Sequence, residues 1–263
     1  MLKIAITGST GLIGSRFIEL LNKDFTIIPL THDLIDITDS EQVSTQLKSI
    51  EFDLLLHLAA FTNVDAAEKE WITAQDINTN GTENLFNYCQ TFNKKFIYIS
   101  TDFVFDGKNS PYDEMSEPNP ISNYGKSKYD GEKIVKNRAM IVRLSYPYGH
   151  PNEVKADFVQ TIKHLLENKV PISMINDSII TPTFIDDIIY GLNYLISNYS
   201  NNIFHLVGNN SLSPFAAGQL IAQTFNLDAA LIKPTTYKDY FLHKAQRPQY
   251  LSLIHISEPT RPY

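Results

Sequence analysis

A tyrosine and a lysine stand four residues apart in the segment Tyr124-Gly-Lys-Ser-Lys128. On a helix, two side chains with this spacing lie on the same face. Free tyrosine has a pKa of about 10, and a nearby ammonium together with an oxidised nicotinamide would lower it. Tyr124 could then donate a proton to a carbonyl oxygen while a hydride reaches the carbon. Lys128 could hold the ribose hydroxyls of the nicotinamide cofactor. Taken alone, the same pattern is also common on solvated helix faces.

Three glycines near the N-terminus supply a second motif for the same chemistry. Gly8, Gly11 and Gly14 join the apolar run 2–7 to an amphipathic segment, in the spacing GxxGxxG. The first glycine permits a tight turn, the second lets the backbone approach a diphosphate, and the third allows close helix packing. The N-terminus of the following helix presents N–H groups and a positive dipole end to an anion. We expect the cofactor to contact the residues of this turn, which are Gly8, Thr10, Gly11, Leu12, Ile13 and Gly14.

The end of the next apolar run bears on which nicotinamide cofactor is bound. An acidic residue there would hold the 2′-hydroxyl of the adenosine ribose and repel a 2′-phosphate, but this run ends in Leu30, Thr31 and His32. Thr31 and His32 could donate hydrogen bonds to a phosphate, with Arg16 close by on the first helix. The sequence therefore favours NADPH, with NADH as the alternative. For His32 alone, an exposed turn without cofactor contact is equally compatible with the sequence.

The apolar run 96–100 ends in Ser100, and Thr101 and Asp102 follow it. Open parallel sheets bind ligands at the edge where the strands end. A hydroxyl at that edge can bond the substrate carbonyl and align it with Tyr124. We predict Thr101 for this role, with Ser100 as the second choice, whereas a hydroxyl that only caps the strand is the structural alternative. Asn80 could line the same cleft or bend its own helix.

The first half of the chain predicts the scaffold that would bring these residues together. Apolar runs too short for helices alternate with helix-sized segments, which is typical of an α/β fold with a Rossmann-type, doubly wound parallel sheet. We expect residues 1–150 to form an NAD(P)-binding Rossmann domain. Residues 151–252 would form a small substrate-binding part with elements that return to the sheet. The expected strands are 2–7, 26–30, 54–58, 96–100 and 141–144, and the expected helices between them are 12–22, 41–49, 71–91 and 123–137.

Composition narrows the classes of function. The 263 residues are 43% hydrophobic and 19% charged, as in ordinary globular proteins, and the net charge of −7 argues against nucleic acid or an anionic membrane as a partner. Cys89 stands alone, and its helical surroundings predict a buried thiol. No apolar stretch approaches membrane-spanning length and no signal-peptide layout is present, so we expect a cytoplasmic protein. The histidines lack metal-ligand spacing, and no metal site is expected. His57 and His205 lie in apolar runs, where we expect them to be buried and hydrogen-bonded.

Longer motifs resemble those of the extended short-chain dehydrogenase/reductases, and within them the dTDP-4-dehydrorhamnose reductase family. The resemblance runs from residue 1 to about residue 252. It rests on the two motifs above and on several further segments, which are DITD at 36–39, HLAAFTNVDAAE at 57–68, STDFVFDG at 100–107, PYDE at 111–114, NPISNYGKSK at 119–128, RLSYPYG at 143–149, ND at 176–177 with TPT at 181–183, and RP at 247–248.

The resemblance implies a reductase that converts dTDP-4-dehydro-6-deoxy-L-mannose to dTDP-L-rhamnose with NAD(P)H, and a homodimer is compatible with it. Some members of the family need magnesium, although no carboxylate cluster of this sequence requires it. The implied cofactor contacts are Asp36 and Ile37 beside the adenine, Ala59, Ala60 and Phe61 under the pyrophosphate and ribose, and Tyr124 and Lys128. The implied reducing triad is Thr101, Tyr124 and Lys128, and the implied substrate contacts are Thr101, Asp102, Phe103, Tyr146 and Arg247.

Several positions depart from the family pattern, and those before residue 160 lie on the substrate side. Phe103 stands where the family has tyrosine, Tyr146 where it has tryptophan, and Ala156-Asp157-Phe158 where Asn-Asn-Phe is usual. Another 4-keto or 2-keto nucleotide sugar would therefore also fit. After residue 252 the sequence leaves the pattern and resembles translated sequencing adapter. We expect residues 253–263 to be a non-native tail and the natural chain to be longer.

Two other classes of function share parts of these motifs. A non-catalytic, NADP-binding regulatory subunit, similar to the beta subunit of methionine adenosyltransferase, would keep the glycine turn. A nucleotide-sugar epimerase or dehydratase would keep the tyrosine and lysine as well. Dehydratases usually carry an acid after the Thr-Asp pair, at the position that Phe103 occupies here, which argues against that chemistry.

Overall fold

The computed structural model describes residues 1–149 and 156–254 of the chain. Its centre is a six-stranded parallel sheet with the strand order β2-β1-β3-β4-β5-β9. The doubly wound α/β fold predicted from the alternating segments is therefore confirmed. The strands of this sheet are β1 (Lys3–Thr7), β2 (Thr26–Leu30), β3 (Leu54–His57), β4 (Lys95–Thr101), β5 (Met140–Leu144) and β9 (Ile203–Leu206).

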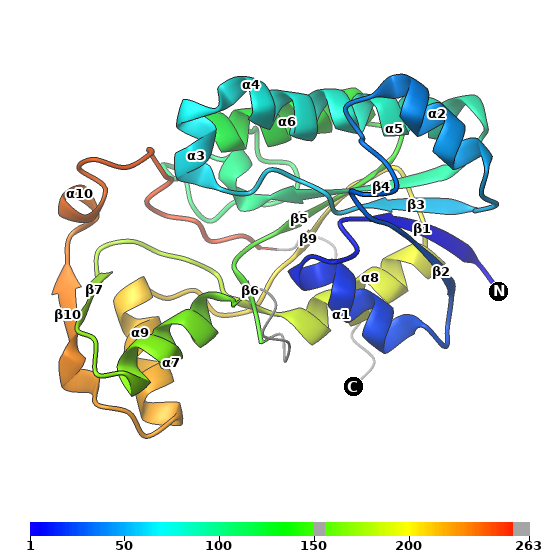
Figure 1. Ribbon diagram of the computed structural model, residues 1–263. Helices are drawn as coiled ribbons and strands as arrows, with labels where there is room; N and C mark the ends of the chain where they lie inside the picture. The colour runs from blue at the N-terminus through cyan, green and yellow to red at the C-terminus, as the bar shows by residue number, and fades with distance from the viewer. Residues whose placement is uncertain (150–155, 255–263) are drawn as a thin grey trace.

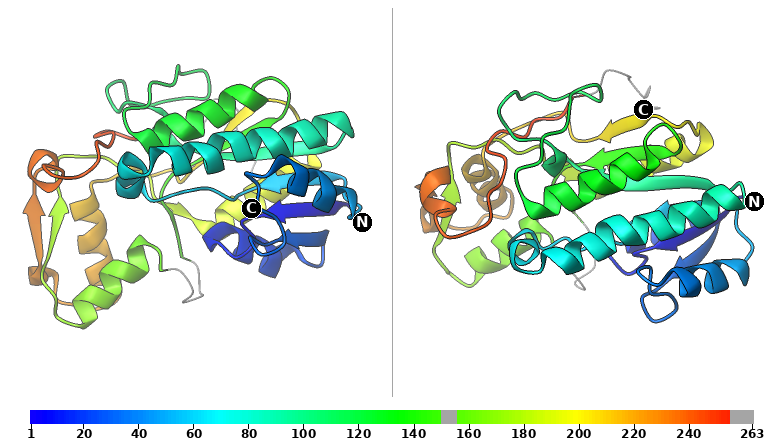
Figure 2. Two further views of the ribbon diagram at one scale, coloured as in Figure 1. Left: turned by 45° about the horizontal axis from the view of Figure 1, so that its top comes forward. Right: turned by 90° about the horizontal axis from the view of Figure 1, so that it is seen from above.

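Helices cover both faces of the sheet (Figure 1). One layer holds α1 and α8, which pack against each other. The opposite layer holds α2 to α6, and the views in Figure 2 show α5 and α6 lying side by side across the sheet. The helices are α1 (Leu12–Leu21), α2 (Ser40–Lys48), α3 (Val64–Lys69), α4 (Trp71–Gln75), α5 (Gly81–Thr91), α6 (Asn123–Val135) and α8 (Ile185–Ser197).

The predicted long helix over 71–91 is interrupted in its middle. Residues Asp76–Asn80 form a turn of π-helix, called η1, between α4 and α5. Asn78 lies in this turn with its side chain fully buried, whereas Asn80 is exposed and donates a hydrogen bond to Asp76 (2.8 Å). The buried asparagine of this turn is therefore Asn78, two residues before the one considered from the sequence. A π-turn inserts one extra residue into a helix and is frequent at functional sites.

Two apolar cores lie on the two faces of the sheet. Alternate residues of the strands point to each face, so Ile97 and Ile99 of β4 pack on the α1/α8 side while Phe96 and Tyr98 pack on the α5/α6 side. Cys89 belongs to the second core and is buried, as predicted. The two histidines of the strands are buried and hydrogen-bonded as expected, His57 to Thr7 and Thr82 and His205 to the carbonyl of Ile254.

A smaller part of the molecule lies beyond the carboxyl ends of the strands (Figure 1). It contains two short two-stranded parallel sheets, β7 with β10 and β6 with β8, and an apolar cluster between α7 and α9. Its elements are β6 (Pro147–Tyr148), α7 (Phe158–Glu167), β7 (Ile172–Ile175), β8 (Thr183–Phe184), α9 (Pro214–Thr224), β10 (Ile232–Thr235) and α10 (Tyr237–Tyr240). The chain between β8 and β10 runs through α8 and β9 and so returns to the large sheet.

The described end of the chain lies against the main body. Tyr112 and Leu253 form a parallel β-bridge, and Leu253 is buried. Residues 255–263, which make up most of the tail expected to be non-native, lie outside the described residues. In the described part of the chain, no helix is long and apolar enough to cross a membrane.

Candidate functional site

The glycine turn lies between β1 and α1, where the carboxyl ends of the strands open toward the smaller part of the molecule. Gly8 has a φ of +66°, and a Cβ there would lie 2.7 Å from the backbone nitrogen of Ala59. A Cβ on Gly14 would lie 2.9 Å from the Cα of Ser9 and still closer to the carbonyl oxygen of Gly8. Both positions therefore require glycine, as the motif predicts.

The same turn has the features of an anion site. Gly11 precedes α1, no side chain caps this helix, and its first turn contains no acidic residue. The hydroxyl of Ser9 is buried in the turn and has no hydrogen-bond partner among the described residues. Free helix N-terminal N–H groups and an unpaired buried hydroxyl suit a diphosphate. The residues present therefore fit a dinucleotide cofactor at this place.

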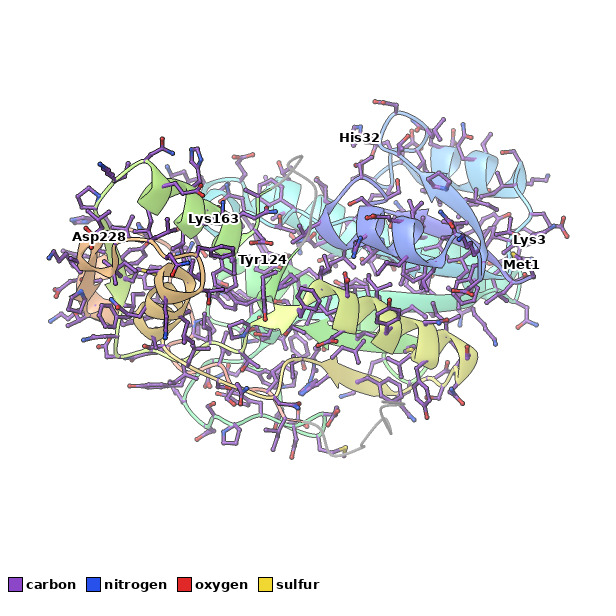
Figure 3. All side chains as sticks on the ribbon, turned by 90° about the horizontal axis from the view of Figure 1, so that it is seen from below. Met1, Lys3, His32, Tyr124, Lys163 and Asp228 are labelled. Carbon is purple, nitrogen blue, oxygen red and sulfur yellow. The ribbon has the colours of Figure 1, made fainter. Side chains whose placement is uncertain are left out.

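Of the side chains expected around a 2′-phosphate, Thr31 and His32 follow β2, and Arg16 forms an ion pair on α1. His32 is exposed and lies at the outer edge of the molecule in Figure 3, and Thr31 is half-buried beside it. Arg16 is engaged elsewhere, because its Nε and Nη2 each bond a carboxylate oxygen of Asp186 at 2.7 Å and its Nη1 lies 2.8 Å from Glu19. This ion pair joins α1 to the start of α8. Arg16 thus links α1 to α8 through this ion pair.

The residues expected along the rest of the cofactor follow β2 and β3. Asp36 is half-buried, and two hydrogen bonds from Thr38 hold the pKa of its carboxyl below the usual value. Ile37 is buried, and a Cβ on Gly81 would touch its side chain. Residues 59–61 are half-buried after the end of β3, beside Gly8. Residues 36–37 and 59–61, which the resemblance implies as cofactor contacts, therefore lie at the same edge of the sheet as the glycine turn.

Tyr124 and Lys128 lie one turn apart on α6, as predicted. Lys128 is 3% exposed, and its Nζ donates to the carbonyl oxygen of Ile99 at 2.8 Å and lies 4.2 Å from the centre of the Tyr98 ring. Burial lowers the pKa of Lys128 to about 7, against the attraction of Glu132. Tyr124 is half-buried, and Figure 3 shows it between α7 and α8.

Thr101 ends β4, and its hydroxyl lies near enough to Tyr124 to lower the pKa of the phenol. The Thr101 hydroxyl also donates to Asp102 at 3.0 Å, and the other carboxylate oxygen of Asp102 accepts from Ser145 at 2.6 Å. The hydroxyl of Ser100 is buried without a partner in the described part of the chain. Of the two hydroxyls considered from the sequence, Thr101 is therefore the one that lies with Tyr124.

The pKa of Tyr124 is raised, whereas the sequence led us to expect that it would be lowered. Burial raises the pKa of Tyr124 to about 12, while the nearby hydroxyl of Thr101 lowers it and the charge of Asp102 raises it further. The Lys128 ammonium contacts the Ile99 carbonyl and the Tyr98 ring instead. The expected lowering by Lys128 is thus absent in the protein alone, and Tyr124 is a neutral phenol at neutral pH. Burial also raises the pKa of Asp102 to about 6.

The residues predicted for the substrate side surround this group. The ring of Phe103 meets the ring of Tyr124 edge to face at 5.6 Å. Tyr146 has a φ of +40°, and burial and the charge of Asp102 raise the pKa of its hydroxyl, whereas Arg247 lowers it. Arg247 itself forms an ion pair with Asp65 of α3 at 2.8 Å. The guanidinium therefore faces the same region as Tyr146 while it holds the C-terminal segment to α3.

Asn78 is a structural member of the site that the sequence reasoning passed over in favour of Asn80. Its amide accepts from the Phe61 nitrogen at 2.8 Å and donates to the Phe61 carbonyl at 3.1 Å and to the Ser127 hydroxyl at 2.9 Å. Ser127 in turn donates to the carbonyl of Tyr124. Asn78 thus links the cofactor-side segment to the helix of Tyr124. The neighbouring sequence NTNGT contains no pattern that distinguishes the two asparagines.

Two cavities lie near the site but do not contain Tyr124. One of about 580 Å³ lies between α7, α9 and the start of α8, and Phe158 separates it from Tyr146. The other, of about 640 Å³, is lined by charged groups from α3 and from the segment before Arg247. Among the described residues, no group of three or more His, Cys, Asp or Glu side chains is placed to hold a metal ion.

A dinucleotide-type turn, a tyrosine and lysine on one helix and a threonine at the adjacent strand end define an oxidoreductase of the short-chain dehydrogenase/reductase type. The sequence matches the RmlD substrate binding domain family over residues 2–258, and the chain belongs to this family.

Individual relatives agree with this assignment. The spore coat polysaccharide biosynthesis protein SpsK of Bacillus subtilis is 30% identical over 260 residues, covering 97% of this chain and 90% of that protein. The structure of dTDP-4-dehydrorhamnose reductase from Bacillus anthracis in complex with NADP is similar with a TM-score of 0.89 and 35% identity, covering 96% of this chain and 90% of that one. Methionine adenosyltransferase 2 subunit beta of Rattus norvegicus is 28% identical over 265 residues, covering 94% of this chain and 78% of that protein.

Proposed function

We propose that this protein reduces the 4-keto group of a nucleotide-activated deoxysugar, with NADPH as the hydride donor and NADH as an alternative. The first candidate substrate is dTDP-4-dehydrorhamnose, which would give dTDP-L-rhamnose. The observation that carries the proposal is that Thr101, at the end of β4, lies beside Tyr124 of α6. Lys128 follows Tyr124 by one turn of the same helix, at the edge of the sheet next to the glycine turn. The NADP complex and the name of the Bacillus anthracis relative support the choice of cofactor and substrate.

The residues of the chain have distinct tasks in this reaction. The turn 8–14 and the N-terminus of α1 would hold the cofactor diphosphate, and Lys128 would bind the ribose. The nicotinamide, when bound, supplies the hydride. Thr101 would hold the substrate oxygen and Tyr124 would donate a proton to it, because a phenol with its pKa raised to about 12 is protonated at neutral pH. Because the Thr101 hydroxyl has one proton, it would turn from Asp102 to the substrate oxygen, while Asp102 keeps its bond from Ser145.

The substrate side favours a sugar held between apolar rings. Phe103 stands against Tyr124, and Tyr146 stands against Phe158 with ring centres 6.1 Å apart. Asp157, at the place of an asparagine in the family pattern, caps α7 and accepts from the backbone nitrogen of Gly149. Its side chain is thereby used within the protein. We therefore expect the sugar to be selected mainly by the faces of Phe103 and Tyr146 and by Asp102.

The competing function is that of a cofactor-binding subunit without turnover, by analogy with the methionine adenosyltransferase relative. The test is to mix the protein with NADPH or NADH and enzymatically prepared dTDP-4-dehydrorhamnose, follow loss of reduced-cofactor absorbance, and identify the product by NMR. Oxidation of NADPH with formation of dTDP-L-rhamnose supports the proposal. Tight NADPH binding without oxidation, for this sugar and a panel of other 4-keto nucleotide sugars, would favour the regulatory role.

A further inference from the structure

The cavity of about 580 Å³ between α7, α9 and the start of α8 has no part in the proposed reaction. It belongs to the smaller part of the molecule, where α7 and α9 lie together (Figure 1). Its wall combines aromatic rings, aliphatic side chains, two asparagines and one carboxylate, and no lysine, arginine or histidine of the described chain lines it. A ligand in this cavity would therefore meet rings and a negative charge but no cation.

Three aromatic rings form one side of this cavity. The ring of Tyr148 on β6 lies 5.9 Å from that of Phe158 on α7, at an angle of 69° between the ring planes. It lies 5.7 Å from the ring of Phe184 on β8, at an angle of 58°. Rings inclined to one another around one space resemble the aromatic cages in which proteins bind quaternary ammonium groups.

Contacts within the protein hold these rings in place. Tyr148 and Phe184 are direct partners in the parallel pairing of β6 with β8. Gly149 follows with a φ of +93°, and a Cβ there would collide with the Phe184 ring. The ring of Phe158 also meets Tyr146 edge to face, with ring centres 6.1 Å apart. Rings that are already ordered lose little conformational freedom when a ligand binds.

The carboxylate of the cavity belongs to Asp187 in the first turn of α8. Asp187 is exposed and has no hydrogen-bond or ion-pair partner among the described residues, whereas the adjacent Asp186 is used in the ion pair with α1. Lys163 of α7 has its ammonium 5.5 Å from the ring centre of Phe225 at the cavity, but it is paired with Glu167 at 2.6 Å. An unpaired carboxylate beside aromatic rings attracts a cation and repels the phosphates of a nucleotide.

We propose that this cavity is a second binding site, and that its ligand is a small organic cation with a quaternary or alkylated ammonium group on an apolar body. The ammonium lies beside Asp187 and its alkyl groups lie among the three rings. The aliphatic side chains of α9 bury the apolar body. The site shares no residue with the group around Tyr124, so it can be tested without cofactor or sugar.

The test compares choline with 3,3-dimethyl-1-butanol, a neutral alcohol of the same shape in which carbon replaces the charged nitrogen. Each is added to the full chain with ¹³C-labelled tyrosine and phenylalanine, and the ring signals are followed by NMR. Benzyltrimethylammonium, which has a larger apolar body, is the second cationic probe. We expect both cations to shift the signals of Tyr148 and Phe184, identified with single variants, and the alcohol to bind about 10-fold more weakly than choline. The absence of shifts with both cations, or equal binding of choline and the alcohol, would overturn the proposal.

Two variants divide the effect between charge and ring. Asp187→Asn, at an exposed position that the fold tolerates, and Tyr148→Leu, which keeps an apolar side chain without the ring, should each weaken choline binding about 3- to 10-fold. Asp33→Asn is the matched control, since it removes the same charge at an exposed position after β2 and should leave binding unchanged. Unchanged binding in both Asp187→Asn and Tyr148→Leu, or an equal loss in Asp33→Asn, would contradict the proposed site. Failure of the parent to reduce any keto sugar would contradict the proposed function and leave these binding results standing.

Discussion

Thr101 has the contacts expected of a residue that aligns a substrate oxygen with a proton donor. Its hydroxyl donates to Asp102 and lies beside Tyr124, and the side chain is 8% exposed at the end of β4. The adjacent Ser100 points to the other side of the strand, where its hydroxyl meets no partner among the described residues. Two neighbouring hydroxyls thus have opposite surroundings, which makes them a matched pair for mutation.

We expect Thr101→Val to lower kcat/KM about 10- to 100-fold, because the loss of a buried hydrogen-bonded hydroxyl costs about 1–3 kcal/mol. Ser100→Ala should change kcat/KM by less than about twofold. Steady-state kinetics with NADPH and the keto sugar measure both effects. Equal losses in the two variants would show that Thr101 has no special role, and a loss confined to Ser100→Ala would reverse the assignment.

At the scale of elements, η1 connects the segment after β3, which is expected to lie along the cofactor, to α6, which carries Tyr124 and Lys128. The amide of Asn78 pairs with both backbone groups of Phe61 and with Ser127, which holds the loop after β3 against α6. Because Thr82 donates to the Asn78 carbonyl and also contacts His57, the same turn is tied to β3. The interruption of the helix is therefore part of how the site is assembled.

Replacing Asn78 tests this connection. Asn78→Ala should lower the free energy of unfolding by about 1–3 kcal/mol, since it leaves the Phe61 groups unpaired in a buried place, and it should reduce kcat as well. Asn80→Ala, two residues away at the surface, should change stability by less than about 0.5 kcal/mol. Urea unfolding and steady-state kinetics on both variants provide the measurement. Similar behaviour of the two variants would contradict the structural role of η1.

The sequence predicts most elements for a physical reason. Buried parallel strands are short apolar runs, so β1 to β5 and the helices α1, α2 and α6 follow from the pattern, whereas the short α3 was not predicted. The glycine turn follows from its place between a strand and a helix. The π-turn at Asp76–Asn80 does not, because it depends on the partners of Asn78 in Phe61 and Ser127. Propensity at 71–91 supports an uninterrupted helix, and tertiary hydrogen bonds override it.

At the scale of the whole molecule, ion pairs between residues far apart in the chain hold separate elements together. Arg16 bonds Asp186 across 170 residues and Arg247 bonds Asp65 across 182 residues. No spacing rule links such partners, so the sequence alone predicts neither ion pair. Arg16 and Arg247 are cations in the sequence, but which carboxylates they pair with depends on the folded arrangement.

The burial of His57 should make the free energy of unfolding of the whole molecule depend on pH. Burial lowers its pKa to about 3, so between about pH 6.5 and 3 the unfolded chain binds a proton at this residue that the folded chain does not. His57 therefore destabilises the fold as the pH falls through this window. Asp102, with its pKa raised to about 6, acts in the opposite direction below about pH 6.

Urea unfolding at several pH values between about 7 and 4 isolates the contribution of His57. In His57→Asn the free energy of unfolding should be lower at neutral pH, because the bonds to Thr7 and Thr82 change, but it should decline less steeply toward acid than in the parent. His243→Asn, at an exposed histidine, should keep the slope of the parent. A parent-like slope in His57→Asn would contradict the neutral, buried state of this ring.

The most direct test of the account concerns hydride and proton transfer at Tyr124. NADPH deuterated at the transferring position of the nicotinamide is mixed with the keto sugar nucleotide and the parent, Tyr124→Phe or Tyr129→Phe, and deuterium at C4 of the product is measured by NMR and mass spectrometry. We predict deuterium transfer by the parent and by Tyr129→Phe, and a rate about 10²- to 10⁴-fold lower for Tyr124→Phe with NADPH binding retained. Undiminished transfer in Tyr124→Phe, or no transfer from NADPH to any keto sugar by the folded parent, would contradict the account.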